Sequence, residues 1–125
     1  MKTLALLLLL AANAMGADFS KLIPALIQVE SGGNDRAVGD NGRSLGCLQI
    51  GPSVIADVNA HYKKEFRHAD AFDRGKAVNI CALYLNIYCK EADFEKASRR
   101  WNGGPTGDRK KATLGYWKKV KANLK

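Results

Sequence analysis

The segment ESGGNDRAVGDNGRSLGCLQI, residues 30–50, decides how the fold of this chain is interpreted. It begins with Glu30, one of only four glutamates, and it contains five of the twelve glycines. Recurring glycines and the Asn41-Gly42 pair favour turns over regular helix. We therefore expect residues 39–51 to form an irregular loop or a short β-hairpin next to Glu30.

A helical pattern leads into this segment from the N-terminal side. Apolar residues recur at helical spacing over residues 19–27. Pro24 suits the first turn of a helix, and the glycines at 32 and 33 end it. Glu30 follows Ile27 by three residues, so it lies at the C-terminal end of the apolar face.

This position predicts a raised pKa for Glu30. Burial disfavours the charged carboxylate, and so does the negative end of the helix dipole. The sequence has no Lys or Arg three or four residues away to offset either effect. A carboxyl group that stays protonated near neutral pH is what a general acid needs. The alternative is an ordinary boundary glutamate that turns to solvent beyond Gly32.

The rest of the chain is mostly helical in pattern, with no repeat and no linker that would divide it. Asp73 is placed to cap one helix, and the segment NGGPTGD, residues 102–108, interrupts the chain before the last one. In the last helix an apolar stripe runs along Leu114, Trp117, Val120 and Leu124. The expected fold class is mainly α, with helices after the first over residues 53–66, 74–92, 94–101 and 112–124.

The N-terminus has the features of a secretory signal peptide. A short positive start precedes an apolar run over residues 4–12, and small residues follow at 13–17. We expect residues 1–17 to be cleaved and residues 18–125 to form the mature domain. The expected location is therefore the periplasm or the medium.

Three cysteines remain in the expected mature chain. Cys81 and Cys89 are eight residues apart on one predicted helix, or about 12 Å, which is too far for a disulfide. An intramolecular disulfide must then use Cys47, and we expect Cys47–Cys81 in preference to Cys47–Cys89. The alternative is three buried free thiols.

The chain carries a formal net charge of +8. A basic exported protein is attracted to anionic polymers, among them cell-wall polysaccharide, acidic lipid and nucleic acid. The basic C-terminal residues 116–125 could form a helix that binds a membrane surface. More often such a helix packs on the protein core and exposes its lysines to water. We expect neither a nucleic-acid partner nor stable membrane insertion.

A metal site is not expected. His61, Glu65 and His68 would share one face of a helix, but their spacing is not the HExxH pattern of zinc enzymes. A solvated amphipathic helix is the better explanation of these three residues.

Four motifs, in order, resemble those of soluble lytic transglycosylases and goose-type lysozymes. The resemblance spans residues 30–120 and implies a lysozyme-like small helical domain that needs no cofactor. Two departures are Trp101 in place of the usual tyrosine and Cys47-Leu48 in place of Leu-Met. The motifs are Glu30-Ser31, Gly46-Cys47-Leu48-Gln49-Ile50, Trp101-Asn102-Gly103-Gly104, and Tyr116 with Val120.

The resemblance implies a specific chemistry for Glu30. As the general acid it would protonate the β-1,4 glycosidic oxygen between N-acetylmuramic acid and N-acetylglucosamine. The same carboxylate would then take the proton of the muramyl C6 hydroxyl, which closes on C1 to give a 1,6-anhydro end. The partner implied is the peptidoglycan strand, and small exported members of the family often serve a larger envelope-spanning machine.

The remaining motif residues are expected to bind substrate or to support the acid. Gln49 would contact an acetamido group, Trp101 would offer a stacking platform, and Asn102 would orient the substrate or the acid. Tyr116 would hydrogen-bond near the acid. Ser31 is expected to brace the turn after Glu30, and Ser44 to line the cleft.

Two alternatives remain open at this stage. Hydrolysis with inversion needs a second carboxylate roughly 6.5–9.5 Å from the acid. Asp40 is the best candidate for that role, because it precedes Gln49 by a spacing similar to that of an aspartate in goose-type lysozymes. A turn residue is the simpler explanation of Asp40. The other alternative is a protein that binds cell-wall glycan without cutting it.

Overall fold

The computed structural model describes residues 17–125. The signal peptide expected at residues 1–17 therefore lies almost wholly outside the described residues, and it stays a prediction. The first described helix, α2 (Ile23–Ser31), has Pro24 in its first turn and ends at Gly32, which adopts a left-handed conformation at φ 63°. These bounds confirm the predicted helix that ends after Glu30.

A two-stranded antiparallel hairpin follows, formed by β1 (Val38–Gly39) and β2 (Ser44–Leu45). A 3₁₀ turn, Asp40–Gly42, joins the strands, and Ile50 pairs back onto Leu45. This confirms the expected hairpin. Gly46 follows β2 at φ 80°, and a Cβ atom there would overlap the Ala71 carbonyl group. Only glycine therefore lets this loop pack against the segment His68–Phe72.

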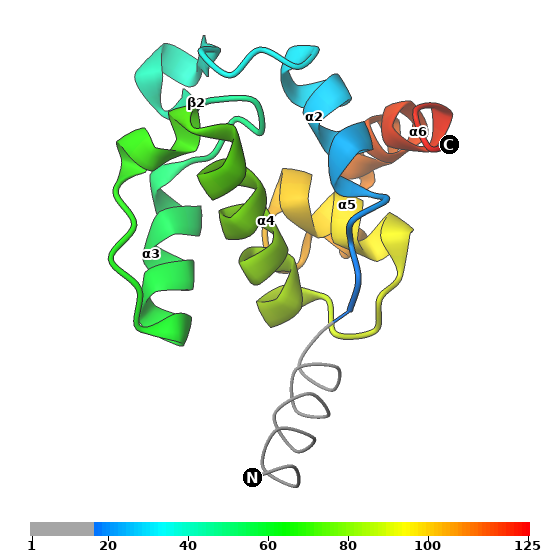
Figure 1. The fold of residues 1–125 in the computed structure, drawn as a ribbon. Coiled ribbons are helices and arrows are strands. Elements are labelled where there is room, and N and C mark those ends of the chain that lie inside the picture. The colour runs from blue at the N-terminus through cyan, green and yellow to red at the C-terminus, as the bar shows by residue number, and fades with distance from the viewer. Residues whose placement is uncertain (1–16) are drawn as a thin grey trace, which may run out of the picture.

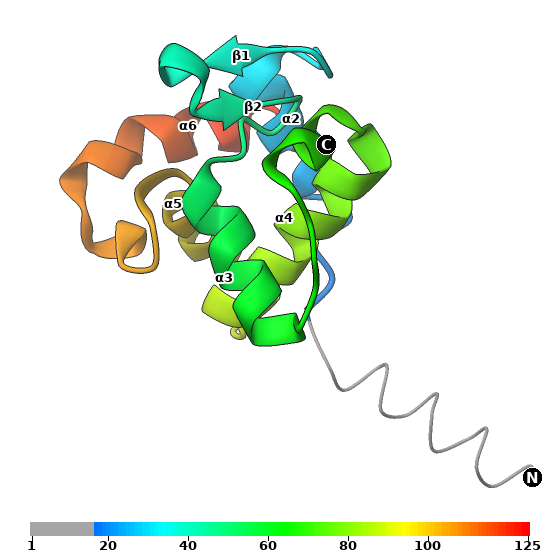
Figure 2. The same ribbon diagram turned by 90° about the vertical axis from the view of Figure 1, so that its left-hand side faces the viewer.

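Four further α-helices are present in the described residues: α3 (Pro52–Tyr62), α4 (Arg74–Tyr88), α5 (Phe94–Gly103) and α6 (Leu114–Ala122). Short 3₁₀ turns at Gly107–Arg109 and Lys111–Thr113 connect α5 to α6. Helix α4 lies at the centre of the molecule and packs against α2, α3 and α5 (Figure 1). The hairpin lies at one end of the molecule, beside α2 (Figure 2).

Several predicted helix boundaries were wrong: α6 is two residues shorter at each end than predicted, and side-chain contacts account for the early ends of α3 and α4. Helix α3 ends at Tyr62, four residues early, because the Asn59 amide bonds both backbone groups of Phe66 and turns the chain. Helix α4 ends at Tyr88 instead of residue 92, because the Arg100 guanidinium bonds the Tyr88 carbonyl oxygen at 2.7 Å. Helix α5 extends to Gly103, two residues past its predicted end at Trp101.

The core is one apolar cluster. Its largest fully buried side chains come from α2 and the residue before it, from α4, and from the motif loop, residues 46–50. They are Leu22, Leu26, Leu48, Ile50, Ile80 and Leu85. The cap predicted at Asp73 is confirmed, because its carboxylate accepts the Lys76 amide at 2.9 Å. The stripe predicted on α6 is only partly buried: Val120 is fully buried, whereas Leu114 is 45% exposed.

The disulfide expected between Cys47 and Cys81 is not formed. All three cysteines are buried free thiols. Cys47 follows Gly46 in the motif loop, and Cys81 lies on α4. Both side chains are fully buried in the apolar cluster, where they pack as small apolar groups. Burial also raises the pKa of the Cys81 thiol well above its ordinary value, which keeps it uncharged.

No helix among residues 17–125 is both long and apolar enough to cross a membrane.

Candidate active site

Glu30 lies in the last turn of α2 and is half-buried. Burial raises the pKa of its carboxyl from an ordinary 4.5 to about 7, although hydrogen bonds from the Tyr116 and Trp101 side chains oppose the shift. The nearby charge of Asp40 raises this pKa slightly further. Glu30 is thus close to half protonated at neutral pH, as its position in the sequence predicts.

Tyr116 reaches Glu30 from the other end of the chain. It lies on α6, and its hydroxyl donates to Glu30 Oε2 at 2.9 Å. Burial also raises the pKa of the Tyr116 phenol far above its usual range, so this hydroxyl remains a proton donor at every physiological pH. The tyrosine therefore holds one carboxyl oxygen of Glu30 in place.

Aromatic residues from α4 and α5 form one wall beside Glu30. The Trp101 and Tyr84 rings pack edge to face with their centroids 5.4 Å apart. Trp101 is almost fully buried, whereas Asn102, the next residue on α5, is exposed. Burial raises the pKa of Tyr84 to about 12, so its hydroxyl is also neutral.

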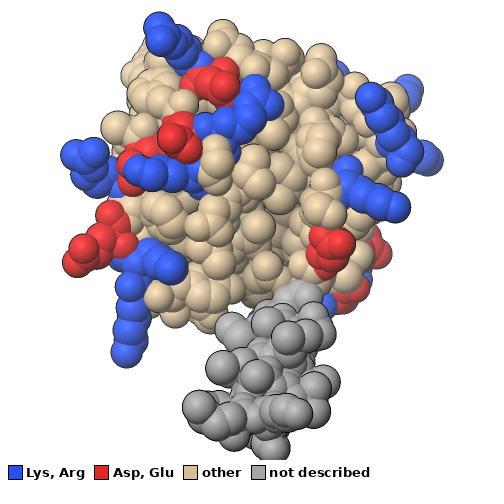
Figure 3. All heavy atoms as spheres, in the orientation of Figure 1, with Lys and Arg blue, Asp and Glu red and all other residues tan. Residues whose placement is uncertain are grey.

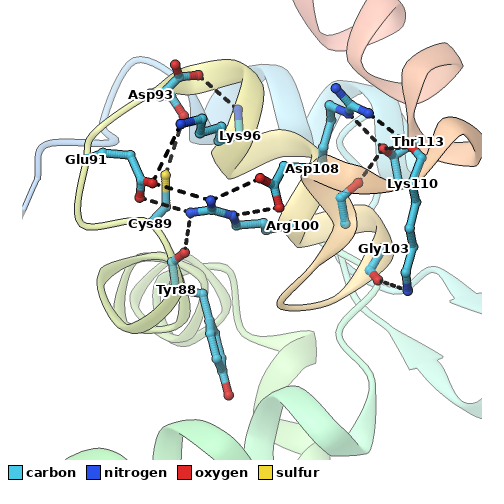
Figure 4. Close-up of polar contacts among 12 residues, drawn as sticks. Tyr88, Cys89, Glu91, Asp93, Lys96, Arg100, Gly103, Asp108, Lys110 and Thr113 are labelled. Carbon is cyan, nitrogen blue, oxygen red and sulfur yellow. Dashed lines mark hydrogen bonds and ion pairs between the residues drawn. The ribbon is translucent and has the colours of Figure 1, made fainter.

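Helix α5 is fixed by an arginine one residue before Trp101. The Arg100 guanidinium donates to Asp108 through two nitrogens and to Glu91 through two, and it also binds the Tyr88 carbonyl oxygen (Figure 4). These contacts tie the end of α4 and the turn at residues 107–109 to α5. The network holds the helix that carries Trp101 and Asn102.

The hairpin forms the opposite wall. Asp40 occupies its turn at φ 49°, and its carboxylate accepts the Ser44 hydroxyl at 2.6 Å. Gln49 follows, also at positive φ, and its amide nitrogen donates to the Gly46 carbonyl oxygen at 3.0 Å. A Cβ atom on Gly39 would overlap Gln49 Oε1, so glycine at position 39 leaves room for the Gln49 amide.

Ser31 acts as a brace, as expected for the turn after Glu30. Its hydroxyl donates to the Cys47 carbonyl oxygen at 2.8 Å and accepts from the amides of Gly33 and Asn34. Among the predicted site residues Ser31 alone has its hydroxyl committed to backbone groups. Its role is to hold the motif loop against the end of α2, and it does not line the cleft.

The two walls enclose a cleft of about 430 Å³ with Glu30 in its lining. It brings together most of the predicted site: Tyr116 reaches it through Glu30, whereas Asp40, Ser44, Gln49, Trp101 and Asn102 line it directly. Sequence reasoning missed five further lining residues: Gly51, Ser53, Val54, Tyr84 and Gly104. Tyr84 occupies the buried face of α4, and helical spacing alone does not distinguish a cleft wall from core.

A larger cavity of about 630 Å³ lies elsewhere, between the start of α2 and the C-terminus, and no carboxylate side chain lines it. Residues 17–125 hold no cluster of His, Cys, Asp and Glu side chains that could bind a metal ion. His61 and His68 do not share a helix, because α3 ends at Tyr62, and the His68 ring instead bonds the Ile50 carbonyl at 2.7 Å.

Comparison with known proteins agrees with this geometry. The chain resembles two solved structures at 25% identity, and no curated protein sequence matches it. One is an inhibitor-bound lysozyme from Meretrix lusoria, with a TM-score of 0.73 over 86% of this chain and 91% of the other. The second is a chain in the complex of Aeromonas hydrophila PliI with Meretrix lusoria lysozyme, with a TM-score of 0.71 over 82% and 87%.

The fold is therefore lysozyme-like, with a helical body and a short hairpin beside a half-buried glutamate. The family model of the transglycosylase SLT domain matches residues 8–124, which is nearly the whole chain. The cleft, the carboxyl with a raised pKa in its lining and this match together identify a glycan-cleaving domain, and the chain belongs to the transglycosylase SLT domain family.

Proposed function

We propose that this protein is a lytic transglycosylase that cleaves the β-1,4 bond between N-acetylmuramic acid and N-acetylglucosamine in peptidoglycan. The observation that carries the proposal is Glu30: a carboxyl with a pKa of about 7, in the lining of a cleft and held by the Tyr116 hydroxyl. Such a group is protonated often enough to act as an acid and ionised easily enough to act as a base.

The first step is protonation of the glycosidic oxygen by Glu30. The bond from that oxygen to the muramyl C1 breaks, and positive charge develops on the ring. The Glu30 carboxylate left behind faces that charge at short range in a partly dehydrated site. The Tyr116 hydroxyl, which remains a donor, stabilises this carboxylate.

The second step returns the proton to Glu30. The carboxylate removes the proton of the muramyl C6 hydroxyl, and that oxygen closes on C1 to form the 1,6-anhydro ring. The acid is regenerated, and no water is consumed. One carboxyl group serves both steps because they occur in sequence, so the reaction needs no second carboxylate.

The walls of the cleft suit binding of amino sugars. The Trp101 indole and the Tyr84 ring are almost fully buried, so they contribute only their edges to the cleft lining, whereas Gln49 and Asn102 supply amide donors and acceptors for acetamido groups. The arrangement argues against a protein that only binds glycan, because a pure binder gains nothing from an acid with a raised pKa in its cleft.

Hydrolysis is the second candidate, and one observation favours it. Asp40 lines the same cleft as Glu30, and its charge acts on the Glu30 pKa, so it is placed to orient a water molecule. Against this role, Asp40 is exposed on a hairpin turn and one of its oxygens already accepts the Ser44 hydroxyl.

Mass spectrometry of the products separates the two reactions. The protein is incubated with purified peptidoglycan, and the soluble fragments are analysed. Fragments with 1,6-anhydro-muramic acid ends are expected; fragments heavier by one water would identify a hydrolase. Glu30→Gln should abolish release while the circular dichroism spectrum is retained, and Asp40→Asn should leave 1,6-anhydro formation intact. Normal release by Glu30→Gln would refute the proposal.

Export of the mature domain to the periplasm or the medium belongs to the same proposal, because peptidoglycan lies outside the cytoplasmic membrane. Service to a larger envelope-spanning assembly is a further prediction from the family resemblance. Detection of the processed chain, beginning near residue 18, in a periplasmic or culture fraction would test the export.

A further inference from the structure

Nearly all of the net positive charge of this protein comes from the C-terminal end of the chain. Residues 17–108 hold twelve basic and twelve acidic side chains, whereas residues 109–125 hold seven basic side chains and no acidic one. The body that forms the hairpin, α2, α3, α4 and α5 is therefore neutral in formal charge. The C-terminal segment, residues 109–125, accounts for a charge of +7.

These C-terminal charges have no anionic partner within the described chain. Each of the ion pairs among residues 17–125 joins side chains that precede residue 109. Lys118, Lys119 and Lys121 are exposed on α6. Blue side chains project from the side of the molecule on which α6 lies (Figure 3).

The apolar side of α6 is already in use. Val120 is fully buried in the core, and Tyr116 is turned inward to Glu30. Leu114 is the one strongly exposed large apolar residue in the C-terminal segment. A helix that enters a bilayer surface needs a free apolar face. This helix instead presents separate point charges to solvent, which suits a hydrated polyanion better than a membrane.

The C-terminal segment also starts at the wall of the cleft. Lys110 Nζ donates to the Gly103 carbonyl oxygen at 2.6 Å, and the next residue, Gly104, lines the cleft. Arg99 on α5 binds the Lys110 carbonyl oxygen and the Thr113 hydroxyl, which fixes the connection. The start of the basic segment therefore adjoins the part of the cleft lining that Gly104 forms.

We infer that residues 109–125 form a second binding surface. This surface binds the carboxylate groups of the peptides on the part of the glycan strand that lies outside the cleft. The inference rests on the proposed function, since it takes the polymer in the cleft to be peptidoglycan. Muramyl residues carry short peptides with free carboxylates, so the strand repeats its negative charges along its length. Exposed lysines that face such a strand form several weak ion pairs and keep the enzyme on the wall between cleavage events.

The test is co-sedimentation with insoluble purified peptidoglycan, in a Glu30→Gln background so that cleavage does not remove the ligand. One variant replaces Lys118, Lys119 and Lys121 by Gln, which has a helix propensity similar to that of lysine. The matched control replaces Lys63, Lys64 and Lys90 by Gln, so the net charge falls by the same amount. These three lysines are exposed, lie outside the C-terminal segment and form no ion pair within residues 17–125. Thermal unfolding checks that both variants are folded.

At low ionic strength the α6 variant should bind roughly ten-fold more weakly, because each exposed ion pair contributes about a two-fold effect. The control should bind within about two-fold of the parent. Peptidoglycan whose carboxylates have been converted to amides should bind the parent and the α6 variant equally. Raising the salt concentration should abolish the difference on native peptidoglycan.

Several results would overturn the inference: equal losses for the two triple variants, undiminished binding to amidated peptidoglycan, or tighter binding of the parent to anionic lipid vesicles or to DNA than to peptidoglycan. The product analysis with unmutated Glu30 is independent of this test. If it showed no cleavage while the α6 effect on binding persisted, the proposed reaction would fail and the binding surface would stand.

Discussion

Tyr116→Phe tests the electrostatic argument for Glu30 without removing the acid. The substitution deletes the hydroxyl that donates to Glu30 Oε2 at 2.9 Å and keeps the ring that fills the space. This hydrogen bond favours the charged carboxylate and so lowers the pKa of Glu30. Its loss should therefore raise that pKa above the present value of about 7.

The size of the shift follows from the energy of such a bond. A hydrogen bond to a charged group contributes about 1.5–3 kcal/mol, and part of it survives when the acceptor is protonated. A difference of about 1.4 kcal/mol between the two protonation states corresponds to one pKa unit. We expect the pKa of Glu30 to rise by about one unit in the variant.

The assay is the pH dependence of kcat/KM for release of soluble fragments from peptidoglycan. A general acid must be protonated, so activity falls as the pH rises through its pKa, and this alkaline limb should move upward by about one pH unit. Overall activity should drop as well, because the acid is less firmly held. Tyr88→Phe is the matched control: it removes a hydroxyl that binds Asp57 and should leave the limb in place. An alkaline limb that stays fixed or moves to lower pH in Tyr116→Phe would refute the reasoning.

Three further substitutions test other contacts. The pKa of Glu30 lies above its unfolded value of 4.5, so this carboxyl destabilises the fold progressively as the pH rises from 4.5 to about 7 and has its full effect above that pH. Glu30→Gln should therefore raise the free energy of unfolding by up to about 3 kcal/mol at pH 8 and by nothing at pH 4, as measured by urea denaturation. Gly39→Ala places a Cβ atom against Gln49 Oε1 and should lower kcat/KM roughly ten-fold or more, whereas Gly115→Ala, which meets open space, should not. Arg100→Met leaves Glu91 and Asp108 without their shared cation and should lower the melting temperature by several degrees in calorimetry, while Arg109→Met, at an exposed residue with no ion pair, should leave it nearly unchanged.

Local chemistry in the sequence predicted the elements near Glu30 well. A proline and two glycines delimit α2, and the Asn41-Gly42 pair marks the hairpin turn. The position of Glu30 on the apolar face indicated a raised pKa, and the motifs elsewhere in the chain favoured this over a glutamate that turns to solvent; burial is the largest cause of the shift. These features depend on residues within one or two helical turns, which is the range over which sequence patterns are informative.

Features that depend on distant residues were not predictable in this way. Helix α4 stops at Tyr88 because Arg100 binds its carbonyl oxygen, twelve residues away in the sequence. Tyr84 had no sequence signal as a cleft residue, because its partner Trp101 comes from another helix. The disulfide was expected from the number of cysteines and from export to an oxidising compartment. In the structure Cys47 and Cys81 are both buried free thiols. Tyr116 was assigned through the family resemblance, and spacing alone would not have paired it with a residue 86 positions earlier.

The two carboxyl groups of the cleft differ in how firmly they are held, and this difference bears on the reaction. Glu30 is fixed by its position on helix α2, by the Tyr116 hydroxyl and by the motif loop, which the Ser31 hydroxyl holds through the Cys47 carbonyl oxygen. Asp40 lies on an exposed turn, where the one side-chain hydrogen bond that it forms within residues 17–125 comes from the Ser44 hydroxyl. A general acid and base must stay within hydrogen-bonding reach of its proton through both steps, and the buried group meets that requirement. A water-activating base must hold its water on the opposite face of the sugar, which an exposed hairpin turn does less well. The rigid acid and the exposed aspartate together favour a reaction in which the substrate's own hydroxyl replaces water as the nucleophile.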